Sequence, residues 1–301
     1  MKRRALLAAG AALGATLLGR HAASKELSSA EFSLVDLHLS GDAAFGRALL
    51  LVPRAMPPDP ELLVLLHGLG ETHDQKVGAR AFAERYGLLS AVARLTHPPL
   101  ARTLPKNDYF GSGRRDQLNA RLAQQPYRTP VIVCPFAPNP YRAGGEATTT
   151  RYAAFLTERL KAEVEQRVGA AFPSARCMIS GVSMGGFLAV EVFLQKPEVF
   201  GALGLAQGAF GPNQASRYAA GVENAVKRVG PRRVEILSSS LDPYRRPNEL
   251  FHQHLQRRKQ ASRLRVSPGP HDQSWLKESG VIEMLLSADD VFAERPGRGA
   301  K

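Results

Sequence analysis

The chain has 301 residues, of which 44% are hydrophobic, and its formal net charge at pH 7 is +13. This length and composition allow one large hydrophobic core or two modest ones. A positive charge of this size is compatible with nucleic acid, anionic lipid or an acidic substrate as a partner. The sequence contains no basic run with interleaved aromatic residues. We therefore expect the arginines to be spread over solvated faces, and we expect no nucleic-acid partner.

Residues 1–24 have the features of an export signal. The basic segment Lys2–Arg4 precedes an apolar stretch, Ala5–Leu18, that is too short to span a bilayer comfortably. The two adjacent arginines leave twin-arginine export open, and small residues at 22–24 offer cleavage sites. No cysteine lies near this junction, which excludes a lipoprotein anchor. We predict an exported protein, periplasmic or secreted, without a stable membrane anchor after cleavage; an uncleaved N-terminal anchor is the alternative.

Apolar runs predict the first strands and a helix. Phe32–Leu39 alternates between apolar and polar residues, and Gly46–Val52 is a second short run. Leu62–Leu66 is continuously apolar, as in a strand that is buried on both faces. A helix is predicted over Ala79–Ala93.

The segment Leu95–Pro130 is the least regular part of the chain. It is rich in proline and contains one short polar helix near Arg114–Gln124. Long loops in compact enzymes are often binding loops or lids, and a surface insertion is equally compatible with this pattern.

Strands and helices alternate over the second half of the chain. The predicted strands are Val131–Cys134, Cys177–Ser180, Ala202–Ala206, Val234–Leu237 and Leu264–Val266, and the predicted helices are Thr150–Val168, Phe187–Gln195, Asn213–Val229, Asn248–Gln260 and Trp275–Leu286. This alternation predicts an α/β fold, with a mostly parallel, twisted sheet of about eight strands and helices on both faces. We expect one domain over 25–294, with an irregular insertion at about 95–130 and a frayed polar tail at 295–301.

The segment Gly181–Gly185 reads GVSMG and lies between a predicted strand and a predicted helix. A G-x-S-x-G in this position is typical of a nucleophile elbow, in which a strained turn lifts the serine hydroxyl clear of the sheet. Side chains in place of the two glycines would collide with the neighbouring strand and helix. We predict Ser183 as the nucleophile and the Met184 N–H as an oxyanion donor, against an ordinary glycine-rich turn.

A serine nucleophile needs a base, and His271 is the candidate. It lies in the loop that follows the last predicted strand, at the edge where parallel sheets place their chemistry. The alternative for His271 is a structural histidine that caps the final helix. His252 and His254 lie within a predicted helix among polar residues, and we expect them to be surface residues.

The base needs an orienting acid, and Asp242 lies in the loop after Val234–Leu237. An aspartate that only opens a turn before a proline is the alternative. Glu235 inside the strand and Asp272 beside the histidine are weaker candidates. The order Ser183, Asp242, His271 is the order expected for an α/β-hydrolase triad.

The turn after Leu62–Leu66 is expected to supply the second oxyanion donor. Leu69 N–H is the predicted donor, with Gly68 and Gly70 allowing close approach of the backbone. We expect His67 to support this loop by hydrogen bonding rather than to transfer a proton.

Cys134 and Cys177 are the only two cysteines, and both lie in apolar runs. We interpret them as small core residues and not as a redox pair or a metal site. Their predicted strands are not neighbours, which makes a disulfide between them geometrically difficult.

Four segments resemble the "putative esterase" branch of the α/β-hydrolases. The segments are LLHGLG (65–70), GVSMGGFLAVEVFLQKPEVFGALG (181–204), LDPY (241–244) and PGPHDQSWL (268–276). The branch includes S-formylglutathione hydrolase (esterase D), feruloyl and acetyl-xylan esterases, siderophore esterases and the mycolyltransferase antigens. The resemblance covers roughly Leu62–Leu286.

The resemblance implies hydrolysis of carboxylic esters through an acyl-enzyme, without a metal or an organic cofactor. It also implies that Trp275 borders the acyl pocket; the full predicted pocket consists of His67, Gly68, Gln207, Tyr244 and Trp275. The chain departs from the branch in the long 95–130 segment. It also departs at Ala206–Gly208, which reads AQG where Ser-Gly is usual.

Together, these features predict an exported serine esterase that acts on a small-molecule or polysaccharide-borne ester. The same triad would also serve an acyltransferase or a serine peptidase. A catalytically inactive hydrolase-fold binding protein is the alternative from a different functional class.

Overall fold

The computed structural model describes residues 27–40, 44–103, 108–142 and 144–294. The expected export signal at 1–24 and the expected polar tail at 295–301 both lie outside the described residues. No helix within these described ranges is long and apolar enough to cross a membrane.

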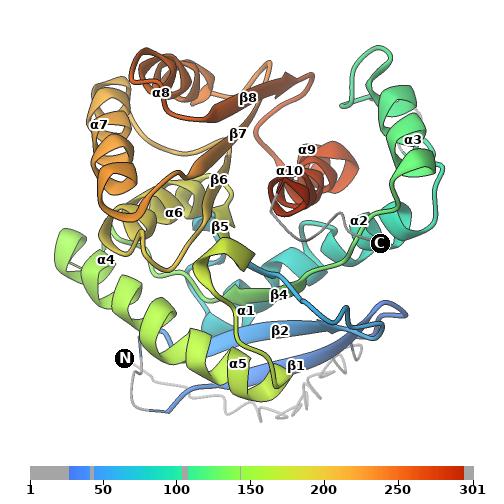
Figure 1. Cartoon of the computed structure of the whole chain (residues 1–301), viewed down its shortest axis with the longest axis horizontal. Coiled ribbons are helices and arrows are strands. Elements are labelled where there is room, and N and C mark those ends of the chain that lie inside the picture. The colour runs from blue at the N-terminus through green and yellow to red at the C-terminus, as the bar shows by residue number, and fades with distance from the viewer. Residues whose placement is uncertain (1–26, 41–43, 104–107, 143, 295–301) are drawn as a thin grey trace, which may run out of the picture.

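Eight strands form a single sheet in the order β1-β2-β4-β3-β5-β6-β7-β8 (Figure 1). The pairs β1–β2 and β2–β4 are antiparallel, and every other pair is parallel. The strands are β1 (Phe32–His38), β2 (Arg47–Pro53), β3 (Leu62–Leu66), β4 (Val131–Pro135), β5 (Cys177–Gly181), β6 (Ala202–Ala206), β7 (Arg233–Ser239) and β8 (Ser262–Ser267). The mostly parallel α/β sheet that the sequence predicts is confirmed.

Helices cover both faces of this sheet (Figure 1). The helices are α1 (Gln75–Glu84), α2 (Leu88–Thr96), α3 (Arg114–Gln124), α4 (Gly145–Ala154), α5 (Lys161–Val168), α6 (Met184–Gln195), α7 (Pro212–Val229), α8 (Arg245–Arg257), α9 (Gln273–Trp275) and α10 (Val281–Ala293). One core cluster joins the sheet to α4–α8. The second cluster joins the opposite face to α1, α2, α3 and α10.

The strand β3 shows why a continuous apolar run suits the middle of this sheet. Successive side chains of a strand point to opposite faces. Leu62, Val64 and Leu66 therefore belong to one core cluster, whereas Leu63 and Leu65 belong to the other. A polar residue at any of these positions would be buried without water, so the run is apolar throughout.

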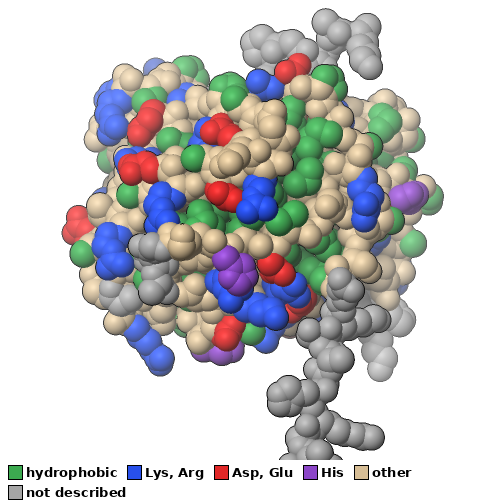
Figure 2. Space-filling model, turned by 90° about the horizontal axis from the view of Figure 1, so that it is seen from below, with side chains coloured by type: hydrophobic (Ala, Val, Ile, Leu, Met, Phe, Trp, Pro, Cys, Tyr) green, Lys and Arg blue, Asp and Glu red, His purple; other side chains and the backbone are tan. Residues whose placement is uncertain are grey.

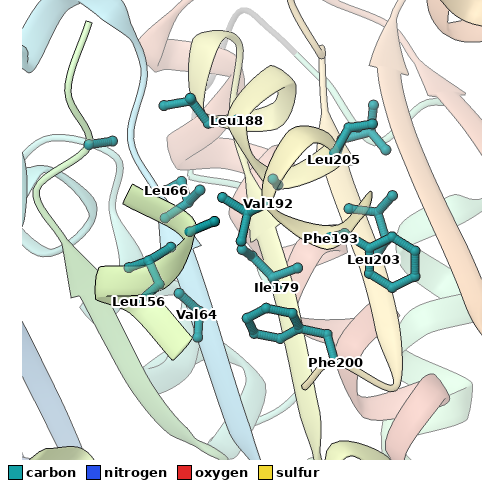
Figure 3. Packing of buried hydrophobic residues seen from close by; sticks show 14 of the residues in the cluster. Val64, Leu66, Leu156, Ile179, Leu188, Val192, Phe193, Phe200, Leu203 and Leu205 are labelled. Atoms are coloured by element: carbon teal, nitrogen blue, oxygen red, sulfur yellow. The ribbon is translucent and has the colours of Figure 1, made fainter. Parts of the chain in front are cut away.

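The helix α6 packs directly on the strands that carry the site. Leu188 and Val192 of α6 lie near Leu66 and Ile179 of the central strands (Figure 3). Each is fully buried, and burial of one such side chain contributes about 1.5–3 kcal/mol. This packing makes the start of α6 a rigid support for the residue that precedes it.

The prediction of a single helix over Ala79–Ala93 is wrong, because the structure has two helices, α1 and α2, in this region. Asp74 caps α1 by accepting a hydrogen bond from the Val77 N–H at 2.8 Å, so the first helix begins early. The first helix ends at Glu84, and Gly87, in a left-handed conformation with φ +82°, is the N-cap of α2. The chain turns at this point and starts α2.

Two other helices extend beyond their expected ends. The helix predicted from Thr150 begins at Gly145 and continues through a π-helical turn, Phe155–Leu160, into α5. The last helix runs through a second π-helical turn, Leu276–Gly280, to Ala293. The short polar helix near Arg114–Gln124 is confirmed as α3.

The helix α3 is attached to α10 by ion pairs. The Arg114 guanidinium donates to both carboxylate oxygens of Glu283 at 2.7 and 2.8 Å. Arg121 donates to Asp289 at 2.9 Å, and Leu118 and Leu122 are buried against the second core cluster. These contacts hold the helical part of the 95–130 segment on the body of the protein.

Cys134 and Cys177 are both free and buried, as core residues would be. They lie on β4 and β5, and β3 separates these two strands. Burial raises the pKa of the Cys134 thiol well above its usual range.

Lys and Arg side chains are interspersed with Asp and Glu on the face that Figure 2 shows. Many of the arginines form ion pairs; Arg80, for example, contacts both Asp36 and Glu84. In such pairs a carboxylate lies beside each guanidinium, so positive and negative charges alternate on this part of the surface.

Candidate active site

Ser183 follows β5 directly and precedes α6, with φ +55° and ψ −118°. A non-glycine residue rarely adopts this backbone conformation. A Cβ atom at Gly181 would lie 2.3 Å from the Gly185 carbonyl oxygen, and one at Gly185 would lie 2.0 Å from the Leu66 carbonyl oxygen. Both glycines are therefore required for the turn, as the sequence indicates.

The structure brings Ser183, His271 and Asp242 into one hydrogen-bonded row. His271 Nε2 lies 3.0 Å from Ser183 Oγ, and His271 Nδ1 lies 2.8 Å from Asp242 Oδ1. A carboxylate accepts from Nδ1–H, so the Nε2 lone pair faces the serine hydroxyl. This is the arrangement in which an imidazole removes the proton of a serine.

Asp242 is held by further hydrogen bonds. Its side chain is inaccessible to solvent. Ser238 Oγ donates to Oδ2 at 2.7 Å, and the Tyr244 N–H donates to Oδ1 at 2.9 Å. With the His271 bond, these donors stabilise the charged carboxylate and fix its orientation.

The loops that carry Asp242 and His271 are tied to each other. The Leu241 N–H donates to the Gly269 carbonyl at 3.0 Å. The Gln207 side chain donates to Ser239 Oγ at 2.7 Å and to the Pro270 carbonyl at 2.9 Å. Gln207 itself has φ +52°. Gln207 of the AQG segment thus links the loops that carry Asp242 and His271.

The expected oxyanion donors occupy the two turns beside Ser183. Met184 is the first residue of α6, and Leu69 is the first residue of a 3₁₀ turn, Leu69–Glu71. The first N–H groups of a helical turn have no partner within the turn and suit an anion. A Cβ atom at Gly68 would lie 3.3 Å from Tyr86 Oη and 3.8 Å from Ser183 Cβ, so the backbone passes close to Ser183 here.

A Cβ atom at Gly70 would meet no atom within 4 Å. Gly70 lines the cleft, and its backbone faces that open space, so the expectation that Gly70 permits a close approach stays a prediction.

His67 supports the turn at Gly68 from the interior and does not line the cleft. The Ala137 N–H donates to Nε2 at 2.9 Å, and Nδ1 donates to the Gly68 carbonyl at 2.8 Å. Burial lowers the pKa of His67 to about 4, so the ring is neutral at physiological pH. The expectation of loop support agrees with this geometry, whereas the placement of His67 in the pocket wall does not.

An open cleft of about 220 Å³ lies beside Ser183. Its lining consists of Gly68, Leu69, Gly70, Glu71, Tyr86, Val182, Ser183, Gln207, His271, Asp272, Gln273 and Leu276. Gly68 and Gln207 therefore lie where the sequence predicts. No described residue of the 95–130 segment is among the lining residues, so the structure gives no evidence for a lid there.

Two other predicted pocket residues lie outside this lining. Trp275 is only 1% exposed; its indole packs beside Gly269 and donates to Ser267 Oγ at 2.8 Å. Trp275 thus fills the interior beneath the His271 loop instead of bordering an acyl pocket. Tyr244 contacts the His271 ring edge-on, with ring centroids 5.5 Å apart.

Tyr86 and Glu71 line the cleft, and the sequence analysis missed both. Each is only 3% exposed. The Tyr86 hydroxyl donates to the Glu71 carboxylate, and the Gly68 N–H donates to Tyr86 Oη at 3.2 Å. The sequence contains no motif for this pair, since Tyr86 lies inside the expected single helix. A glycine at 87 is the only local sign of a break after Tyr86.

No group of three or more His, Cys, Asp or Glu side chains that could hold a metal ion occurs in the described part of the chain.

The family model described as "Putative esterase" matches residues 133–282, which include Ser183, Asp242 and His271. The chain belongs to this esterase family. The resemblance seen in the sequence is thus confirmed, and the protein is an esterase of the carboxylesterase type. A comparison with curated proteins finds no match.

Solved structures with the same fold include three esterases. A ferulic acid esterase superposes with a TM-score of 0.64 at 16% identity, covering 87% of this chain and 99% of that chain. S-formylglutathione hydrolase from Staphylococcus aureus gives 0.53 at 13% identity, covering 87% and 98%. The feruloyl esterase module from Clostridium thermocellum, complexed with sinapinate, gives 0.56 at 14% identity, covering 88% and 89%. At these identities the likeness shows that the esterase shares their fold.

Proposed function

We propose that this esterase hydrolyses carboxylic esters by way of an acyl-enzyme on Ser183. The observation that carries the proposal is the Asp242–His271–Ser183 row, in which both bonds are 3.0 Å or shorter and the serine opens into a cleft. These distances are within the range that general-base catalysis needs.

In the first half of the proposed reaction, Ser183 Oγ attacks the ester carbonyl while His271 Nε2 takes the hydroxyl proton. The carbonyl oxygen becomes an oxyanion, which accepts from the Met184 and Leu69 N–H groups. Asp242 stabilises the imidazolium that forms. His271 then gives its proton to the leaving alcohol, and the acyl group remains on Ser183.

In the second half, a water molecule attacks the acyl-enzyme, and His271 takes a proton from this water. A second oxyanion forms in the same position and collapses to the acid, and the proton returns to Ser183. No cofactor is needed for either half, since His271 passes the Ser183 proton to the leaving alcohol and then passes a proton from water back to Ser183.

The size of the cleft favours a short acyl group. A volume of about 220 Å³ is below the range usual for drug-sized ligands. We propose a small-molecule or polysaccharide-borne ester as the substrate. Among structures of the same fold are a ferulic acid esterase and a feruloyl esterase module, so methyl ferulate belongs in the substrate panel.

The test is turnover of p-nitrophenyl esters from acetate to palmitate by the wild type and by Ser183→Ala. We expect kcat/KM to fall with chain length, and the variant to lose activity by at least about 10⁴-fold. A fluorophosphonate probe should label the wild type and not the variant. Full turnover by Ser183→Ala would contradict the proposed mechanism.

We also propose that the esterase is exported through residues 1–24. The support is the basic segment and the short apolar stretch at the start of the sequence. Fractionation of cells that express the full chain and a chain without residues 1–24 tests this. We expect only the full chain to leave the cytoplasm.

A further inference from the structure

The cleft contains one pair of buried polar side chains that the proposed reaction does not use, Tyr86 and Glu71. A buried carboxylate and a buried phenol are costly unless each has a hydrogen-bond partner. Here the phenol donates to Glu71, and Glu71 also lies 3.5 Å from the Arg85 guanidinium. Burial and the adjacent carboxylate raise the pKa of Tyr86, so the phenol keeps its proton.

The direction of this hydrogen bond decides what the Tyr86 oxygen can do. A hydroxyl has one proton to donate and lone pairs to accept with. Because its proton is directed to Glu71, the oxygen is left as an acceptor, and the Gly68 N–H donates to it at 3.2 Å. Glu71 therefore determines the orientation of the phenol, and the phenol holds the peptide group before Gly68.

The peptide group after Gly68 is held from the other side. Its carbonyl oxygen accepts from His67 Nδ1 at 2.8 Å, and its N–H is that of Leu69, the proposed oxyanion donor. In a planar trans peptide the C=O and N–H point in opposite directions. The two bonds together fix both peptide planes at Gly68 (φ −78°, ψ −177°) and thereby the direction of the Leu69 N–H.

We propose that Tyr86, oriented by Glu71, is a positioning residue that aims the Leu69 N–H at the oxyanion. The inference rests on the proposed function, since it concerns the oxyanion site of that reaction. The break between α1 and α2 at Gly87 makes it possible, because it places Tyr86 at the cleft instead of inside a continuous helix.

The test compares Tyr86→Phe with the wild type by kinetics and by two ketone inhibitors. Trifluoroacetophenone adds to a serine nucleophile and forms a tetrahedral oxyanion, whereas acetophenone binds without adding. We expect kcat/KM for p-nitrophenyl acetate to fall about 10- to 100-fold, less than the loss of a whole oxyanion donor. The Ki of trifluoroacetophenone should rise by a similar factor, and the Ki of acetophenone should stay the same.

Tyr218→Phe is the matched control. Tyr218 is also buried, and its hydroxyl donates to a glutamate, Glu191, at 2.7 Å, but it lies on α7 and not at the cleft. This variant should lose stability to a comparable degree and keep the kinetic and inhibition constants of the wild type. A purely structural role for Tyr86 would make the two variants behave alike, and that result would overturn the inference.

Glu71→Gln is a second variant, which tests the positioning role of Tyr86 if Tyr86→Phe does not fold. The amide can donate to the phenol oxygen and so compete with the Gly68 N–H. We expect a several-fold rise in the Ki of trifluoroacetophenone, typical of one weakened hydrogen bond. An unchanged Ki in the folded variant would overturn the inference. An active Ser183→Ala would instead refute the proposed function, so the two failures are distinguishable.

Discussion

Ser183 occupies a backbone conformation that costs free energy, on the order of 1–3 kcal/mol. The surrounding structure maintains it because Gly181 and Gly185 leave room for the backbone of β3 and α6 to approach. The local pattern G-x-S-x-G therefore predicts the turn well, since each requirement is met within five residues. The partners of the serine come from loops 59 and 88 positions away along the chain.

At the residue scale, Asp242→Asn should lower kcat by about 10³–10⁴-fold while the fold is kept. An amide has nearly the same shape, but it favours the imidazole tautomer whose proton is on Nε2, which cannot accept from Ser183. The measurement is p-nitrophenyl acetate turnover together with the melting temperature. Asp59→Asn is the control, because Asp59 is exposed and forms only a surface ion pair with Arg176. Near-normal turnover by Asp242→Asn would show that the orienting acid lies elsewhere.

Among the elements, α3 of the 95–130 segment is attached to α10 by ion pairs. Arg121 contacts both Asp289 and Asp290 of α10, and 168 positions separate Arg121 from Asp289 in the sequence. The composition of this segment indicated only an irregular region with one polar helix. That pattern predicts no partner for the charged side chains of α3, whereas the structure shows that Arg114 and Arg121 hold the helix on α10.

Arg121→Met should lower the free energy of unfolding by about 1–3 kcal/mol, because the variant loses a charge-assisted hydrogen bond to the buried Asp289 carboxylate and an ion pair with Asp290. Urea unfolding measures this change, and kcat/KM should remain within about twofold, since α3 does not line the cleft. Arg228→Met, which removes an exposed and longer ion pair to Glu198, should cost less than about 0.5 kcal/mol. A large loss of activity in a folded Arg121→Met would indicate that α3 controls access to the site.

For the whole molecule, burial of His67 behind the turn at Gly68 makes stability depend on pH. Its pKa is about 4 in the folded protein and 6.5 without the fold. Between these values the unfolded chain binds a proton that the folded protein does not. The contribution of His67 to the free energy of unfolding is therefore fully present above pH 6.5 and is lost as the pH falls toward 4.

From pH 7 to pH 5, His67 should account for a loss of about 2 kcal/mol in the free energy of unfolding. His67→Asn, which cannot titrate, should be less stable at pH 7 but lose less stability on acidification. Urea unfolding at both pH values measures the two slopes. Burial raises the pKa values of Glu235, Glu278 and Glu283, and these groups change stability with pH in the opposite direction to His67. The effect of His67 is therefore the difference in slope between the wild type and His67→Asn. Equal slopes would show that His67 does not titrate in this range.

The amino-acid sequence was sufficient to predict the sheet, the turn at Ser183 and the order of the three candidate catalytic residues. Each depends on patterns within a few positions: the apolar runs of β3–β7, the glycines around Ser183, and the loops that follow parallel strands. These patterns are local because a strand needs only its own side chains to be apolar on the buried faces.

The surroundings of Ser183, Asp242 and His271 could be derived only from the folded chain. The Tyr86–Glu71 pair, the interior position of Trp275 and the attachment of α3 to α10 depend on side chains that distant segments bring together. Whether a tryptophan near a histidine lines a pocket or fills a core depends on the space beneath the loop, and no local pattern specifies that space. The chain could thus be placed among esterases from its motifs, whereas the shape of its cleft could be derived only from the packed molecule.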